Sequence, residues 1–104
     1  MIDMKVVLLI EWDNPKEEER LEKRYSYTRE ETDPYWKGKI EEGIIQKVSD
    51  WADNTGHRVK WVEFEDMDAL AKLWSEKEFH RGLVGFSRLV DNLSYRLLRP
   101  TIQF

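Results

Sequence analysis

Two residues stand out as candidates for moving a proton in a catalytic reaction, and the first is His80. It lies in the stretch "LAKLWSEKEFHRG", residues 70–82. An imidazole with an ordinary pKa of about 6.5 can act as general base toward a phenolic or enolic substrate. The alternative is a half-buried helical histidine that hydrogen-bonds to water or to the backbone. We take His80 as a candidate catalytic residue.

The second candidate is Glu11, which follows Val7 and Leu9 at alternate positions of an apolar run. Apolar surroundings raise the pKa of a carboxyl group and can turn it into a proton donor or acceptor near neutral pH. Because Glu11 lies near the end of this run, the alternative is a carboxylate that reaches solvent or pairs with an arginine such as Arg96 or Arg58. Glu11 is therefore the second predicted catalytic residue.

Aromatic side chains are numerous, with five tryptophans and four tyrosines in 104 residues. They suit the wall of a cleft for a small aromatic or hydrophobic molecule. Equally, a small domain uses large side chains to bury area in its core and at a dimer interface. Tyr35 and Trp36 follow the helix-breaking "TDP" and suit the mouth of a cleft, whereas Trp61 and Tyr95 lie on expected strands. These four are the predicted substrate-binding residues.

Composition excludes several classes of site. The sequence has no cysteine, and its two histidines lie on separate segments, with His57 in an expected turn. It contains no phosphate-binding loop, nucleophile elbow or HExxH motif. We therefore expect no metal and no cofactor. The lack of cysteine fits a reducing cytoplasm.

The partners expected from charge and hydropathy are also limited. A formal net charge of −4 argues against nucleic acid, whose phosphates require a basic face. The apolar run "VVLLI" is only five residues long, too short for a signal segment or a membrane-spanning helix. With 40% hydrophobic and 37% charged residues, the chain should form one domain over 1–104 that interacts with neither nucleic acid nor membrane.

The first half of the sequence predicts a strand followed by helix. Residues 4–12 are apolar at both odd and even positions, which is typical of a central strand covered on both faces. Asp13 or Asn14 should cap the next helix, with Pro15 in its first turn. That helix carries the thin apolar stripe Leu21, Tyr25 and Thr28, residues 32–34 should break or kink it, and Gly43 should end the segment that follows.

The runs "IIQKVSDWA" and "RVKWVEFE" flank "DNTGH" and predict a hairpin. A register in which paired residue numbers sum to 110 places Lys47 opposite Glu63, Asp50 opposite Lys60, and an apolar pair between them. Opposite charges across strands are favourable, so this register is the expected one.

The last third predicts two helices and an edge strand. Asp66 or Asp68 should cap the first helix, and Ser75 with Glu78 matches a capping box that starts the second, with Trp74 and Phe79 as its hydrophobic staple. Phe79, Leu83, Phe86 and Val90 should face the core, and Asn92 should end this helix. The closing "SYRLLRPTIQF" reads as a strand at a sheet edge because it contains Pro100.

The order β-α-(α)-β-β-α-β predicts an α+β fold, the ferredoxin-like βαββαβ arrangement of a four-stranded antiparallel sheet with helices on one face. The other face of that sheet would be bare, although the strands are apolar on both sides. A second copy that stacks sheet on sheet would cover it.

At the level of whole segments, the chain resembles the dimeric α/β-barrel superfamily, which includes antibiotic-biosynthesis-type monooxygenases and EthD-like proteins. The resemblance rests on "KVVLLIEW", on "WADNTGHRVKWVEFE" running into "DMDALAKLW", on "SEKEF" and on "LVDNLSYRLLRPTI". It implies a homodimeric barrel with a cleft between sheet and helices in each subunit. Haem-degrading members are similar in having a tryptophan that matches Trp74, but here Val84 and Gly85 occupy the region of their axial histidine.

The function expected from the sequence is the binding of a small aromatic or hydrophobic molecule. It extends to cofactor-independent, monooxygenase-like conversion in which His80 removes a proton inside a cleft lined by Trp and Tyr. The alternative is a non-catalytic ligand-sensing or dimerisation module, and haem binding is the least favoured hypothesis.

Overall fold

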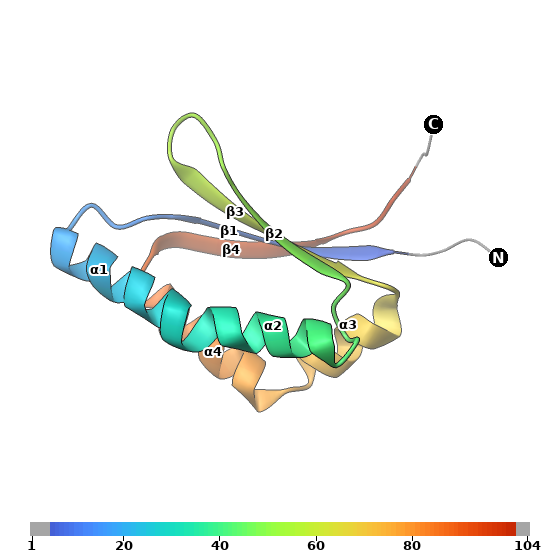
Figure 1. Cartoon of the computed structure of the whole chain (residues 1–104). Coiled ribbons are helices and arrows are strands. Elements are labelled where there is room, and N and C mark those ends of the chain that lie inside the picture. Colours follow the sequence, from blue (N-terminus) through green and yellow to red (C-terminus); the bar gives the residue numbers. More distant parts are fainter. Residues whose placement is uncertain (1–4, 102–104) are drawn as a thin grey trace.

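The chain folds as a four-stranded antiparallel sheet with all its helices on one face (Figure 1). The structure is a computed structural model that describes residues 5–101. The strands are β1 (Val6–Asp13), β2 (Lys47–Ala52), β3 (His57–Phe64) and β4 (Asp91–Leu98), in the spatial order β2-β3-β1-β4. This α+β arrangement is the ferredoxin-like fold expected from the sequence.

The first helical region is continuous where a break or kink was predicted at residues 32–34. It runs as α1 (Glu18–Tyr27), the π-helical segment η1 (Thr28–Thr32) and α2 (Asp33–Glu41) without interruption. Pro34 does not break it. The proline lies in the first turn of α2, directly after the π-helical segment, where the usual α-helical hydrogen bonds are already rearranged. Gly43, with φ 79°, ends the region as predicted.

The start of this region differs from the prediction. Asp13 is the last residue of β1, and α1 begins only at Glu18, after Glu17. The side-chain oxygen of Asn14 accepts a hydrogen bond from the indole of Trp12 at 3.2 Å. Asn14 thus anchors the loop to the strand, and neither predicted cap begins the helix.

The hairpin has the predicted register. Lys47 pairs with Glu63 and Asp50 pairs with Lys60. The Lys60 ammonium also lies 2.7 Å from an Asp50 carboxylate oxygen, so the charge complementarity that suggested the register is realised as an ion pair.

The second helical region divides into α3 (Met67–Trp74) and α4 (Lys77–Ser87). Asp66 caps α3 by accepting the Ala69 amide, as predicted. The capping box at Ser75 is wrong: this hydroxyl donates back to the Lys72 carbonyl at 2.7 Å, and Glu76 precedes α4. The expected contact of Trp74 with Phe79 is present, with ring centroids 5.3 Å apart.

The chain leaves α4 earlier than predicted, and Asn92 lies within β4 with φ 55°. β4 is an edge strand, as expected, but it ends before Pro100. The predicted strand residue Met4 and the C-terminal segment 102–104 lie outside the described residues. Within 5–101, no helix combines the length and apolar character needed to cross a membrane.

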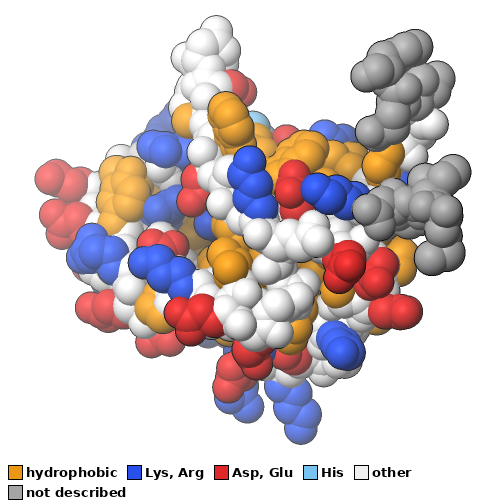
Figure 2. Space-filling model, turned by 45° about the vertical axis from the view of Figure 1, so that its right-hand side comes forward, with side chains coloured by type: hydrophobic (Ala, Val, Ile, Leu, Met, Phe, Trp, Pro, Cys, Tyr) orange, Lys and Arg blue, Asp and Glu red, His pale blue; other side chains and the backbone are white. Residues whose placement is uncertain are grey.

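The core lies between the sheet and the helices. Its strand contribution is the even-numbered face of β1 and β3, and its helix contribution comes from α2, α3 and α4; the fully buried side chains include Val6, Leu8, Ile45, Val62, Phe64 and Leu73. The opposite face of the sheet carries no helix (Figure 1). Hydrophobic side chains gather there between the hairpin and the chain ends, mixed with charges of both signs (Figure 2).

Candidate functional site

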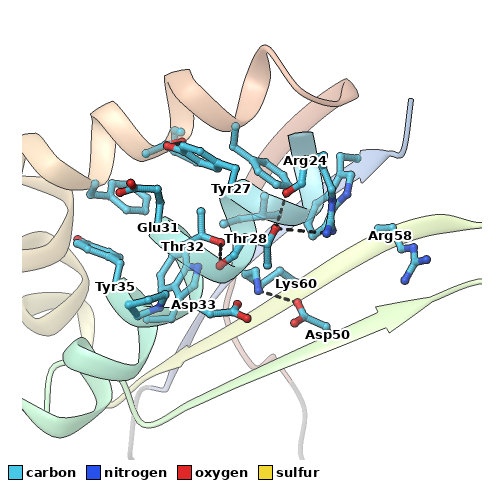
Figure 3. Close-up of a pocket in the computed structure, with 18 of the residues that line it drawn as sticks. Arg24, Tyr27, Thr28, Glu31, Thr32, Asp33, Tyr35, Asp50, Arg58 and Lys60 are labelled. Atoms are coloured by element: carbon cyan, nitrogen blue, oxygen red, sulfur yellow. Dashed lines mark hydrogen bonds and ion pairs between the residues drawn. The ribbon is translucent and has the colours of Figure 1, made fainter. Parts of the chain in front are cut away.

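A cavity of about 880 Å³ lies between the helices and the β2–β3 end of the sheet. This is the cleft between sheet and helices that the sequence predicted, and its volume is in the range typical of small-molecule sites. Seven aromatic residues line it: Trp12, Tyr27, Tyr35, Trp36, Trp51, Phe79 and Phe86. The π-helical segment η1 forms part of its wall (Figure 3). π turns inside α-helices are frequent at functional sites.

Tyr35 and Trp36 are the predicted binding residues that line this cavity. The Tyr35 hydroxyl donates to a Glu76 carboxylate oxygen at 2.7 Å, and Lys39 donates to the other oxygen at 2.9 Å. Burial, followed by the bond to Glu76, raises the pKa of Tyr35. The phenol therefore stays protonated and serves as a hydrogen-bond donor. This Tyr35–Lys39–Glu76 clamp joins α2 to the start of α4.

Tyr27 is a second phenol in the wall. Its hydroxyl donates to the Gly82 carbonyl at 3.3 Å, and burial raises its pKa. Gly85 lies against the same ring, where an added Cβ would come within 2.5 Å of the Tyr27 oxygen. The absence of a side chain at Gly85 therefore allows α4 to approach α1.

His80 lies outside the cavity, exposed on the outer face of α4. Its Nε2 is 2.6 Å from the carbonyl oxygen of Trp74, so Nε2 carries a proton and donates to this end of α3. The imidazole also packs edge-on against Trp74, with centroids 5.2 Å apart. This is the backbone-bonded histidine that the sequence left as the alternative to a catalytic base.

Glu11 is on the helix-free face of the sheet. Its carboxylate lies 3.3 Å from Nε2 of His57 and 3.5 Å from a guanidinium nitrogen of Arg96. His57 also reaches Asp13, at 2.7 Å between Nδ1 and the carboxylate. Asp13 is the main cause of the raised pKa of His57. The contact with Arg96 matches the alternative given for Glu11, a carboxylate that pairs with an arginine. His57, at the end of the hairpin turn, is part of the same ionic cluster.

The other two predicted binding residues are also away from the cavity. Trp61 lies on the helix-free face, and its indole donates to Glu63 at 3.1 Å. Tyr95 is half exposed on the edge strand and packs against Trp74, with centroids 5.4 Å apart. The structure thus brings together only Tyr35 and Trp36 of the six predicted site residues.

The sequence analysis missed the four cationic residues of the cavity: Arg24, Arg58, Lys60 and Arg81. A signal was available for the first three. Arg24 lies three residues after Leu21 and four before Thr28, inside the apolar stripe of α1. Arg58 and Lys60 have the strand parity of the buried Val62, which directs them toward the helices.

Residues 5–101 contain no group of three or more metal-ligating side chains arranged to hold an ion. The cavity wall instead combines aromatic rings, protonated phenols and cations. This arrangement can enclose an apolar body and offer hydrogen-bond donors to one end of it.

Comparison with known proteins adds information on the fold. No protein-family model matches the sequence, and neither does any curated protein. Among solved structures, the chain is similar to the crystal structure of a NIPSNAP family protein from Agrobacterium tumefaciens str. C58. The TM-score is 0.61 at 15% identity, and the match covers 97% of this chain and 90% of that one. At this identity the likeness shows the fold alone, and the closer resemblance to antibiotic-biosynthesis-type monooxygenases and EthD-like proteins stays a prediction.

Proposed function

We propose that this protein binds a small, largely hydrophobic or aromatic molecule in the cavity between its sheet and its helices. The observation that carries the proposal is the aromatic cavity of about 880 Å³. Concave sites of this volume with a mostly aromatic lining and a few polar groups are typical of small-molecule binding.

Binding is better supported than catalysis. Among the described residues that line the cavity there is no histidine, so the proton removal assigned to His80 has no counterpart there. The sequence analysis also suggested that the protein converts a bound aromatic substrate without a cofactor, and we keep this as a secondary proposal. It would depend on the phenols of Tyr27 and Tyr35 and on the carboxylates at the cavity rim. A reducing compartment such as the cytoplasm suits a chain without cysteine.

We also propose that the protein is a homodimer joined through the helix-free face of the sheet. Trp51 on this face is 64% exposed, an unusual exposure for a tryptophan. Both signs of charge occur beside it, with Lys47 and Arg96 against Glu63 and Glu11, so one copy of the face is complementary to another.

Native mass spectrometry of the freshly purified chain tests both proposals, because one spectrum reports subunit number and retained mass. We expect a dimer that carries a small molecule. The variant Gly82→Leu should lose this molecule, because Gly82 lines the cavity and an added Cβ there meets no atom within 4 Å. Gly38→Leu is the matched control: it is also a helical glycine with open space at Cβ, but it lies outside the cavity lining.

The dimer has its own pair of variants. Trp51→Glu should give a monomer in sedimentation velocity, because it buries a charge at the proposed interface. Since Trp51 also borders the cavity, this variant is judged by its subunit number alone. Val84→Glu changes an apolar side chain of 52% exposure on α4 and should leave the dimer intact. If the wild-type protein is a monomer, the proposed dimeric barrel is wrong. If it is a dimer without retained mass that also binds none of a set of hydrophobic compounds, the proposed ligand site is wrong.

A further inference from the structure

Two guanidinium groups, one buried and one half-buried, lie at one end of the cavity and form no ion pair with any of residues 5–101. Arg24 comes from α1 and Arg58 from β3 (Figure 3). Arg24 is only 8% exposed, and Nε of each arginine is buried with no hydrogen-bond partner among residues 5–101. The side-chain hydrogen bond of Arg24 is to a neutral group, the Thr28 hydroxyl, at 3.3 Å.

The surroundings of Arg24 do not neutralise its charge. Burial is the main cause that lowers its pKa, and the like charge of Arg58 lowers it further. Tyr25, Asp50 and Asp33 act in the opposite direction without reversing the shift. Asp50 is also engaged elsewhere, because it already forms the 2.7 Å ion pair with Lys60. A buried charge without a partner is costly, so the site is electrostatically incomplete.

Aromatic rings compensate for part of this cost. The Arg24 guanidinium carbon lies 5.4 Å from the Trp12 ring centroid and 5.5 Å from that of Phe86. Such cation–π contacts are attractive and offset part of the cost of burying the charge. The rings contact the face of the guanidinium plane but accept no hydrogen bond from the N–H groups at its edge. These edge N–H groups are the donors that fit the two oxygens of a carboxylate.

We propose that Arg24 and Arg58 bind the carboxylate of a small organic acid whose hydrophobic body extends along the aromatic wall of the cavity. This inference rests on the proposed function and names the class of its ligand. The acid group would lie at the Arg24–Arg58 end, and the body would point toward Tyr35, which lies at the opposite end in Figure 3.

The charges at the rim favour a single negative charge over a phosphate. Five carboxylates line the cavity together with four cationic side chains: Glu30, Glu31, Asp33, Asp50 and Glu78, against Arg24, Arg58, Lys60 and Arg81. Most of these acids are exposed, so they would repel a dianion more strongly than a monoanion as it enters.

The test compares acids with neutral alcohols of matched shape on the full-length protein. Isothermal titration calorimetry would measure 2-naphthoate against 2-naphthalenemethanol, and octanoate against 1-octanol. For the pair that fits the cavity, the acid should bind wild type about tenfold or more tightly than the alcohol, the factor expected from one charge-assisted hydrogen bond. Inorganic phosphate alone should bind more weakly than the acid.

Three arginine variants locate the effect. Arg24→Met and Arg58→Met should each weaken binding of the acid about tenfold and leave the alcohol within about threefold. Arg81→Met is the matched control, because this arginine lines the same cavity but is exposed at its rim, and it should change the acid affinity less than about threefold. Circular dichroism checks folding, and Arg24 and Arg58 come from different elements, so loss of one variant to misfolding still leaves the other.

The outcomes separate this inference from the proposed function. Equal affinity for acid and alcohol, or an Arg81→Met effect as large as that of Arg24→Met or Arg58→Met, would overturn the carboxylate site while leaving hydrophobic binding in place. Phosphate binding as tight as that of the acid would also overturn it. If neither acids nor alcohols bind wild type, the ligand site itself is wrong, and the inference fails with it.

Discussion

The Tyr35–Lys39–Glu76 clamp should contribute measurably to stability, and Glu76→Gln tests it most directly. Glu76 accepts from Tyr35 at 2.7 Å and from Lys39 at 2.9 Å, and its side chain is only 28% exposed. Glutamine keeps the shape and one acceptor but removes the charge. Its amide nitrogen cannot accept from Lys39, which is 12% exposed and would keep Glu42, at 3.0 Å, as its remaining carboxylate.

The expected magnitude follows from the bonds that change. Hydrogen bonds to charged groups contribute about 1.5–3 kcal/mol and neutral ones about 0.5–1.5 kcal/mol. Glu76→Gln weakens one bond and removes another, but Glu42 compensates in part. We therefore expect a loss of about 1–2 kcal/mol in the free energy of unfolding, equivalent to a melting temperature lower by about 5–10 °C for a domain of this size.

The pH dependence supplies a second criterion. Burial alone would raise the pKa of Glu76, but the bonds from Lys39 and Tyr35 outweigh it, and the pKa is lowered from 4.5. A carboxyl group with a lowered pKa in the folded state stabilises the fold fully above its unfolded value, and this contribution disappears as the pH falls through the folded value. The difference between wild type and Glu76→Gln should therefore be constant at neutral pH and shrink in acid.

Urea denaturation followed by tryptophan fluorescence, at one protein concentration, measures this difference from about pH 7 down to about pH 4 and below. Glu78→Gln is the control: it removes an exposed carboxylate from the same helical turn and should cost no more than about 0.5 kcal/mol. An equal loss in Glu78→Gln, or a loss in Glu76→Gln that persists undiminished in acid, would refute the assignment of this stability to the clamp.

Two further predictions concern α4 and the helix-free face. Gly82→Ala should raise stability by about 0.5–1 kcal/mol through helix propensity, whereas Gly85→Ala should be about 1–3 kcal/mol less stable than Gly82→Ala because its Cβ displaces the Tyr27 ring; equal melting temperatures would contradict this. His57, whose bond to Asp13 raises its pKa above 6.5, should stabilise the fold fully below that pH and lose its contribution as the pH rises through the folded value. His57→Gln should abolish this alkaline decline, and an NMR titration of His57 at or below 6.5 would disprove the premise.

Local patterns in the sequence were sufficient for the type of most elements and for the hairpin register. The register could be predicted because each of its charges has a single opposite partner across the strands, as in Asp50 and Lys60. The helix ends were predicted less well. Ser75 has the spacing of a cap, yet its hydroxyl bonds backward to the Lys72 carbonyl. A cap depends on the backbone angle at which the chain turns, and packing sets that angle.

The sequence by itself determined the α+β fold and the order of its elements along the chain, because these follow from hydrophobic periodicity and charge pairing. The cleft between sheet and helices was expected only from the resemblance to the barrel superfamily. Only the tertiary structure decided which charged groups enter that cleft. It placed His80 outside, against the end of α3, and buried Arg24 between α1 and the sheet. Periodicity specifies which face of an element is covered, but the distance between two covered faces, and so the space left for a ligand, depends on how the helices pack across the sheet.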